Sequence, residues 1–144
     1  MDIKYLKFDI VYATLKFDEN KKVKARPVLL LENDNVYNVF DIYKITTKNN
    51  NDNYNYEIKK WKEAGLKEPS YIKLKSIETI NKDVLAKDKL GTLQDEDIKG
   101  MNKKLVEIAL IELEKEKNEK EFSEKIQIPE NILKSINKDN DGNK

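Results

Sequence analysis

The stretch Arg26-Pro27-Val28-Leu29-Leu30-Leu31 and the later stretch Ile45-Thr46-Thr47-Lys48 decide the expected fold and the expected site. The continuous apolar run predicts a strand that is buried on both faces, since a half-buried strand would alternate. Arg26 lies near the start of this strand. The hydroxyls of Thr46 and Thr47 and the ammonium of Lys48 lie at the end of the next strand. If the strands are neighbours, these groups converge on one surface spot. A phosphodiester fits such a spot, because a guanidinium donates N–H groups in a fork that matches phosphate oxygens.

Composition restricts the chemistry that the chain can use. Its 144 residues are expected to form one main domain with its own core. The net charge is +1, so a nucleic-acid site would have to be a local patch. Histidine and cysteine are absent, which removes the usual base, the usual nucleophile and thiolate zinc sites. We therefore expect no metal and no cofactor. No apolar run approaches the ~20 residues that span a bilayer, and no signal peptide is recognisable, so we expect a cytoplasmic protein without membrane contact.

Several short segments have the alternation or the β-branched and aromatic content of strands. Polar turns are expected between them at 18–22 and 33–35, and a polar loop at 48–53. A short helical turn is expected over 61–66, ended by Gly65. Short strands joined by polar turns predict a small closed barrel or a sandwich. The expected strands are 9–17, 24–32, 36–46, 54–58, 70–75, 77–80 and 89–93.

A helix is expected from Asp95 to about Lys117, because apolar residues recur there at helical spacing. Acidic residues at 95–97 crowd its first turn, where the helix dipole favours anions, and we expect them to be solvated. The apolar stripe is expected to be core rather than a partner surface. It should pack on the strands through Ile98, Met101, Leu105 and Ile108. The domain is expected to cover 1–117, and a polar, partly disordered extension to cover 118–144, with a short helix at 129–136.

The order of motifs resembles a known family. The segments are DIVYATL, RPVLLL, ITTK, WKEAGLKEPSYIKL and KLGTLQDEDIKGMNKKL. Together they resemble the MazF/PemK toxins of bacterial toxin–antitoxin modules, and the resemblance covers roughly residues 9–113. It implies a mainly β (α+β) fold, an SH3-like small β-barrel with a C-terminal helix. It also implies metal-independent cleavage of single-stranded RNA, a homodimer, and silencing by a protein antitoxin that binds in the RNA groove.

The resemblance assigns the catalytic pair to Arg26 and Thr46. The chemistry agrees in part, since Arg26 can stabilise the charge of a phosphorane and Thr46 can hydrogen-bond a phosphate oxygen or the 2′-OH. The general base stays open, because arginine is always protonated and threonine is too weak an acid. The further candidates for RNA contacts are Thr47, Lys48, Ser70, Lys73 and Lys75. Lysines are more often solvated surface charges, and threonines suit strand ends by propensity alone.

Three positions depart from the family pattern, and two of them, Lys73 and Lys75, leave other functions open. Relatives often carry an arginine and an acid where this chain has Lys73 and Lys75, and a small residue where it has Phe8. A non-catalytic relative that binds RNA or a protein is therefore a second hypothesis. A gyrase poison like CcdB is a weaker third, because that toxin ends in a short hydrophobic C-terminus and this chain ends Asp141-Gly142-Asn143-Lys144. For stacking on bases, Tyr54 and Tyr56 are better candidates than Trp61.

Overall fold

The computed structural model describes residues 5–16, 23–49 and 53–126. The chain divides into two compact units, Met1–Leu105 and Val106–Lys144. The first contains the strands and the first turns of the helix, and the second begins within the helix. The turn expected at 18–22, the short helix at 129–136 and the disordered end at 139–144 lie outside the described residues.

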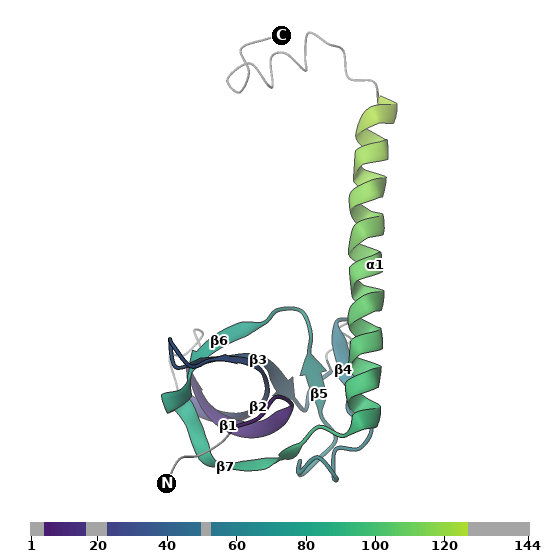
Figure 1. Cartoon of the computed structure of the whole chain (residues 1–144). Coiled ribbons are helices and arrows are strands. Elements are labelled where there is room, and N and C mark those ends of the chain that lie inside the picture. The colour runs from purple at the N-terminus through teal and green to yellow at the C-terminus, as the bar shows by residue number, and fades with distance from the viewer. Residues whose placement is uncertain (1–4, 17–22, 50–52, 127–144) are drawn as a thin grey trace. The chain divides into compact units, whose positions relative to one another are not determined.

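The first unit is an antiparallel sheet that curls strongly (Figure 1). Its strands follow the order β4-β5-β3-β2-β1-β7, and β6 pairs with β3 beside this path. The mainly β fold with a C-terminal helix is confirmed, although the ladder of described strands does not close into a ring. The elements are β1 (Asp9–Lys16), β2 (Val23–Asp34), β3 (Val39–Thr46), β4 (Asn55–Glu57), β5 (Tyr71–Lys73), β6 (Glu78–Asn81), the 3-10 helix η1 (Lys82–Val84), β7 (Leu85–Thr92) and α1 (Asp95–Ile126).

The turn between β2 and β3 lies later in the chain than the sequence predicted. The Asp34 carboxylate accepts hydrogen bonds from the N–H groups of Val36 and Tyr37, at 2.9 and 3.2 Å. Asn38 then adopts a φ of 59°, which asparagine tolerates better than most residues. The turn therefore occupies 35–38, and the prediction of 33–35 was wrong because β2 continues through two polar residues.

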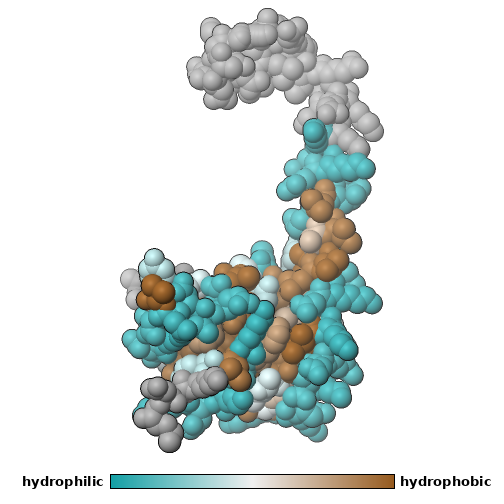
Figure 2. Space-filling model, in the orientation of Figure 1, coloured by the Kyte–Doolittle hydropathy of each residue, from teal (hydrophilic) through white to brown (hydrophobic). Residues whose placement is uncertain are grey.

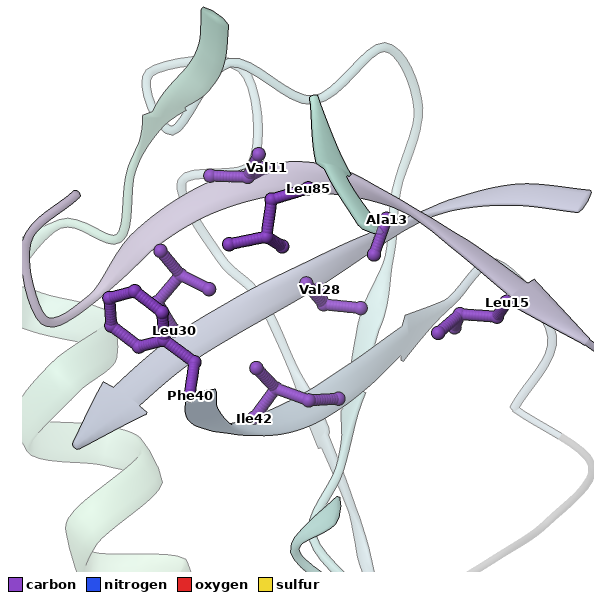
Figure 3. Packing of buried hydrophobic residues seen from close by; sticks show 8 residues of the cluster. All are labelled: Val11, Ala13, Leu15, Val28, Leu30, Phe40, Ile42 and Leu85. Carbon is purple, nitrogen blue, oxygen red and sulfur yellow. The ribbon is translucent and has the colours of Figure 1, made fainter. Parts of the chain in front are cut away.

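The inner face of the curled sheet holds an apolar cluster from β1, β2, β3 and β7, whose side chains point toward one another (Figure 3). Val28, Leu29 and Leu30 are all fully buried, so both faces of β2 are covered, as the apolar run predicted. The cluster consists of Val11, Ala13, Leu15, Val28, Leu30, Phe40, Ile42 and Leu85.

Two glycines explain two of the family-like motifs. A Cβ on Gly65 would overlap the carbonyl oxygen of Leu90, and a Cβ on Gly91 would overlap that of Ala64. Gly65 also has a φ of +93°, which side chains rarely adopt. The backbones of the AGL segment (64–66) and the LGTL segment (90–93) are therefore in direct contact, and the two glycines make this possible. The segment around Trp61 is a hydrogen-bonded turn, in which the N–H of Ala64 donates to the carbonyl oxygen of Lys60 at 3.0 Å, as in a single helical turn, and Gly65 lies at its end as expected.

The first turn of α1 contains a buried carboxylate, which corrects the expectation of three solvated acids. Asp97 is fully buried and accepts hydrogen bonds from the Tyr56 hydroxyl at 2.7 Å and from the N–H groups of Lys59 and Lys60 at 2.8 and 2.9 Å. Burial, and then the bond to Asp97, raise the pKa of Tyr56. Asp97 thus ties the helix start to the segment after β4.

The helix continues beyond the expected end near Lys117, to Ile126. Met101 is buried, as predicted for the stripe. Within the second unit, however, apolar residues are exposed on the helix surface, and Figure 2 shows hydrophobic residues there in brown beside hydrophilic ones in teal. The expectation that the whole stripe is core was therefore wrong for Ile111 and Leu113, and Val106 and Leu110 beside them are exposed as well. In the described part of the chain, no helix is long and apolar enough to cross a membrane.

Candidate functional site

Two rows of side chains on the inner face change from apolar to polar at the same end of the sheet. On β2 the row runs from Val28 to Arg26, and on β3 it runs from Ile42 through Lys44 to Thr46. Val28 lies directly opposite Lys44. Continuing this register by two residues on each strand brings Arg26 opposite Thr46. The two sequence segments therefore do belong to neighbouring strands, and their functional groups converge as the sequence suggested.

A cavity of about 230 Å³ opens at this end of the sheet. Six of the seven candidate residues line it, namely Arg26, Thr46, Thr47, Lys48, Ser70 and Lys73. The other residues that line it are Leu15, Pro27, Lys44 and Ile45. We refer to this cavity and its ten lining residues as the pocket. Lys75 is exposed in the turn after β5 and is not among the residues that line the pocket.

Strand β5 brings Lys73 into the pocket. Ile45 on β3 lies opposite Ile72 on β5 in an antiparallel pair. Continuing this register by one residue places Lys73 opposite Lys44, and directly opposite residues share one face of a sheet. Sequence reasoning did not single out Lys44. Its signal was available, since it is the first charged residue in the otherwise apolar row of Phe40 and Ile42.

Ser70 lies in the pocket lining in a role that is mainly structural. It is only 2% exposed, and its hydroxyl donates a hydrogen bond to the carbonyl oxygen of Glu68 at 2.8 Å. Its own carbonyl oxygen accepts from the N–H of Ile58 at 3.0 Å. Because the hydroxyl hydrogen is already used, Ser70 cannot at the same time donate to a phosphate oxygen.

The hydroxyl of Thr46 is held by the backbone that follows it. Thr46 Oγ1 accepts a hydrogen bond from the N–H of Lys48 at 3.1 Å, and Thr46 is half-buried at the end of β3. A hydroxyl can donate its hydrogen while its oxygen accepts. The bond therefore fixes the position of the oxygen and is compatible with donation to a ligand in the pocket. Thr47 and Lys48 are exposed at the rim.

Four cationic side chains line the pocket: Arg26, Lys44, Lys48 and Lys73. Arg26 is the only arginine in the chain, so the only guanidinium of the protein lies here. Lys44 forms an ion pair with Glu78 on β6, at 2.7 Å between Nζ and Oε2. A concave site with several cations and a fixed hydroxyl suits a phosphodiester. Among the described residues, no group of three or more acids could hold a metal ion.

The aromatic residues proposed for base stacking lie elsewhere. The Tyr56 hydroxyl is bonded to buried Asp97, so this side chain fixes the loop after β4. Trp61 is half-buried, and the ammonium of Lys62 lies 5.3 Å from its ring centre. Neither these residues nor Tyr54 line the pocket. A stacking role for them stays a prediction without support from the pocket's geometry.

Comparisons with known proteins place the chain. Residues 6–109 match the family of PemK-like, MazF-like toxins of type II toxin–antitoxin systems. Among solved structures, the chain is similar to the Mycobacterium tuberculosis toxin MazF-mt6, with 24% identity and a TM-score of 0.49, over 67% of this chain and 90% of that one. A search among curated proteins gives no match. All residues that line the pocket fall within the matched range.

Proposed function

Because the chain belongs to the PemK-like, MazF-like toxins of type II toxin–antitoxin systems, we propose that it is an endoribonuclease that cleaves single-stranded RNA without a metal ion. The observation that carries this proposal is the convergence of the only guanidinium and the fixed Thr46 hydroxyl in one pocket. RNA contains its own nucleophile, so a site that positions the chain and stabilises charge can accelerate cleavage without a histidine or cysteine.

In the proposed reaction, a ribose 2′-oxygen attacks the adjacent phosphorus and the bond from phosphorus to the 5′-oxygen breaks. The products are a 2′,3′-cyclic phosphate and a 5′-hydroxyl. Arg26 binds the phosphate oxygens and stabilises the phosphorane by charge alone, since it is not titrated. Thr46 donates its hydroxyl hydrogen to an oxygen of the same phosphate. The proton of the 2′-hydroxyl passes to water, and the 5′-oxygen takes a proton from water.

The lysines of the pocket have a binding role in this proposal. Lys48 and Lys73 are exposed, and each can contact a phosphate next to the cleaved one. Thr47 lies beside them and can hydrogen-bond the RNA backbone. Ser70 acts as a positioning residue, because its hydroxyl already bonds the carbonyl oxygen of Glu68.

The proposed partners follow from the family. A type II toxin has a protein antitoxin, and an acidic antitoxin segment would compete with RNA for the cations of the pocket. We also propose a homodimer, since one pocket is short for an extended RNA and two-fold pairs are the commonest oligomers. Sedimentation at micromolar concentration tests this, and a monomer there would contradict it.

The function is tested on RNA with two variants of one residue. Purified wild type, Arg26→Ala and Arg26→Lys are incubated with a long single-stranded RNA in EDTA. We expect the Arg26→Ala variant to cleave RNA at least on the order of a hundredfold more slowly than the wild type, because the charge that stabilises the phosphorane is lost. Arg26→Lys is the matched control, since it keeps the charge and loses the fork, and it should recover only part of the rate. Urea unfolding followed by the fluorescence of Trp61, the only tryptophan, checks that each variant is folded.

Two outcomes would contradict the proposal. Equal cleavage by wild type and Arg26→Ala would remove Arg26 from the mechanism. Binding of RNA without any cleavage by the wild type, over RNAs of varied sequence, would favour the non-catalytic relative. The replacement of the usual acid by Lys75 is the observation that keeps this second function in view.

A further inference from the structure

Lys44 is the cation of the pocket that the family pattern does not assign. It lies on the inner face of β3, two residues before Thr46, at the point where β3 changes partners. Its strand pairs with β6 through Val39–Ile42 and with β5 through Ile45–Thr46. Lys44 falls between these two ladders, and its side chain lines the pocket.

Glu78 is an acid on the same inner face. It lies directly opposite Ile42, so its side chain shares the face of that core residue, and Ile80, the next residue of its row, packs against the core cluster. Lys44 and Glu78 are thus diagonal neighbours across β3 and β6. Their charged atoms are 2.7 Å apart. The side chains are 36% and 42% exposed, so the pair is within reach of solvent. Lys44 lines the pocket, whereas Glu78 is not among the lining residues.

We infer that Lys44 is a further phosphate-contacting residue of the pocket, and that Glu78 competes with the nucleic-acid phosphate for it. This rests on the proposed function in one respect, namely that the ligand is a single-stranded nucleic acid. A partly exposed ion pair holds its partners only weakly. A phosphate bound by Arg26 and Lys73 lies where it can take Lys44 from Glu78, because all three cations line the same pocket. Lys44 is two residues from Thr46 on β3, and the β3–β5 register, continued by one residue, places it opposite Lys73. Glu78 therefore lowers the affinity of the pocket for polyanions.

Binding to a pool of random single-stranded DNA tests the inference, because DNA lacks the 2′-hydroxyl and is not cut by the proposed reaction. Affinity is measured over a salt series for wild type, Glu78→Gln, Lys44→Met and the double variant. We expect Glu78→Gln to bind about two- to fivefold more tightly at low salt. Lys44→Met should bind more weakly and lose about 0.7 from the log–log salt slope, the value for one phosphate contact on a single strand. In the Lys44→Met background, Glu78→Gln should change nothing.

A second ion pair supplies the matched control. Lys7 and Glu32 are 2.6 Å apart, and Glu32 lies toward the end of β2 that is far from Arg26. Glu32→Gln makes the same change in net charge as Glu78→Gln, and it should leave DNA affinity unchanged within error. Equal tightening by both variants would show a general charge effect and would overturn the inference. Tightening by Glu78→Gln that persists in the Lys44→Met background would overturn it as well.

Cleavage assays on RNA separate the failure of this inference from the failure of the proposed function. If RNA is cut in an Arg26-dependent way while the DNA-binding pattern is absent, the inference is wrong and the proposed function stands. If the DNA-binding pattern is present and no RNA is cut, the proposed catalysis is wrong and the phosphate contact stands. Loss of cleavage in Glu78→Gln at unchanged affinity would assign Glu78 to acid–base chemistry and overturn its role as a competitor.

Discussion

The inner face of the sheet has two ends that differ in chemistry although the same strands build both. Toward one end, Val28 and Ile42 are fully buried in the apolar cluster. Toward the other, the same rows continue as Arg26 and Thr46 and line the pocket. The β2–β3 pairing extends to Val28 opposite Lys44, so the core holds both strands directly before Arg26 and Thr46. Stability and activity should therefore respond to different residues within a single row.

The largest difference between an effect on stability and an effect on cleavage is expected for substitutions of Ile42 and Thr46, which lie in one row of β3. Ile42→Ala leaves a cavity in the core and should lower the free energy of unfolding by about 2–5 kcal/mol. Thr46→Val keeps the shape of a half-buried strand residue and removes its hydroxyl. It should change the free energy of unfolding by less than about 1 kcal/mol and slow RNA cleavage at least about tenfold.

Urea unfolding followed by Trp61 fluorescence, and cleavage rates per folded molecule, measure both variants in parallel. Ile42→Ala should keep the cleavage rate of the wild type at temperatures where it is folded. The separation of the two ends would be contradicted if Thr46→Val were as destabilising as Ile42→Ala. It would also be contradicted if Ile42→Ala slowed cleavage as strongly as Thr46→Val.

A second prediction tests which lysines near the pocket contact nucleic acid. Lys48 and Lys73 line it, whereas Lys75 does not. Replacing the first two by glutamine should weaken binding of single-stranded DNA and reduce the log–log salt slope by up to roughly 1.4, for two phosphate contacts. Lys75→Gln, in the turn that follows β5, is the matched control and should leave the slope unchanged. A slope that falls with Lys75→Gln would extend the nucleic-acid site beyond the pocket.

The sequence predicted the convergence of Arg26 and Thr46 better than it predicted the residues that surround them. The convergence of Arg26 and Thr46 followed from two segments, because neighbouring antiparallel strands bring their facing ends together. Lys44 was missed although it continues the row of Phe40 and Ile42, because the strand partners that direct this row into the pocket do not follow from periodicity. The buried role of Asp97 was missed for a similar reason. An acid in the first turn of a helix satisfies the dipole rule whether or not a distant loop donates hydrogen bonds to it.

The smallest predicted effect concerns Phe8, which lies just before β1, toward the end of the sheet away from the pocket. Its φ is 74°, a left-handed conformation that costs a residue with a side chain about 1–2 kcal/mol. The backbone is held there on both sides, since the Phe8 N–H donates to the Leu30 carbonyl oxygen at 2.7 Å and the Phe8 carbonyl oxygen accepts from the N–H of Leu93 at 2.9 Å. The small residue that the resemblance led us to expect here would relieve this strain, whereas Phe8 does not.

Two substitutions isolate the strain from the packing of the aromatic ring. Phe8→Ala and Phe8→Gly both remove the ring, and only glycine relieves the left-handed backbone, so Phe8→Gly should be the more stable by about 0.5–1 kcal/mol. Thr14 is an exposed site in β1 without a positive φ. There, Thr14→Gly should be less stable than Thr14→Ala, because glycine weakens a strand. Neither Phe8 variant should change RNA cleavage, since Leu15 at the pocket lies roughly 20 Å further along β1. A change in cleavage would mean that strain at the apolar end reaches the pocket, and the two ends could then no longer be treated as independent.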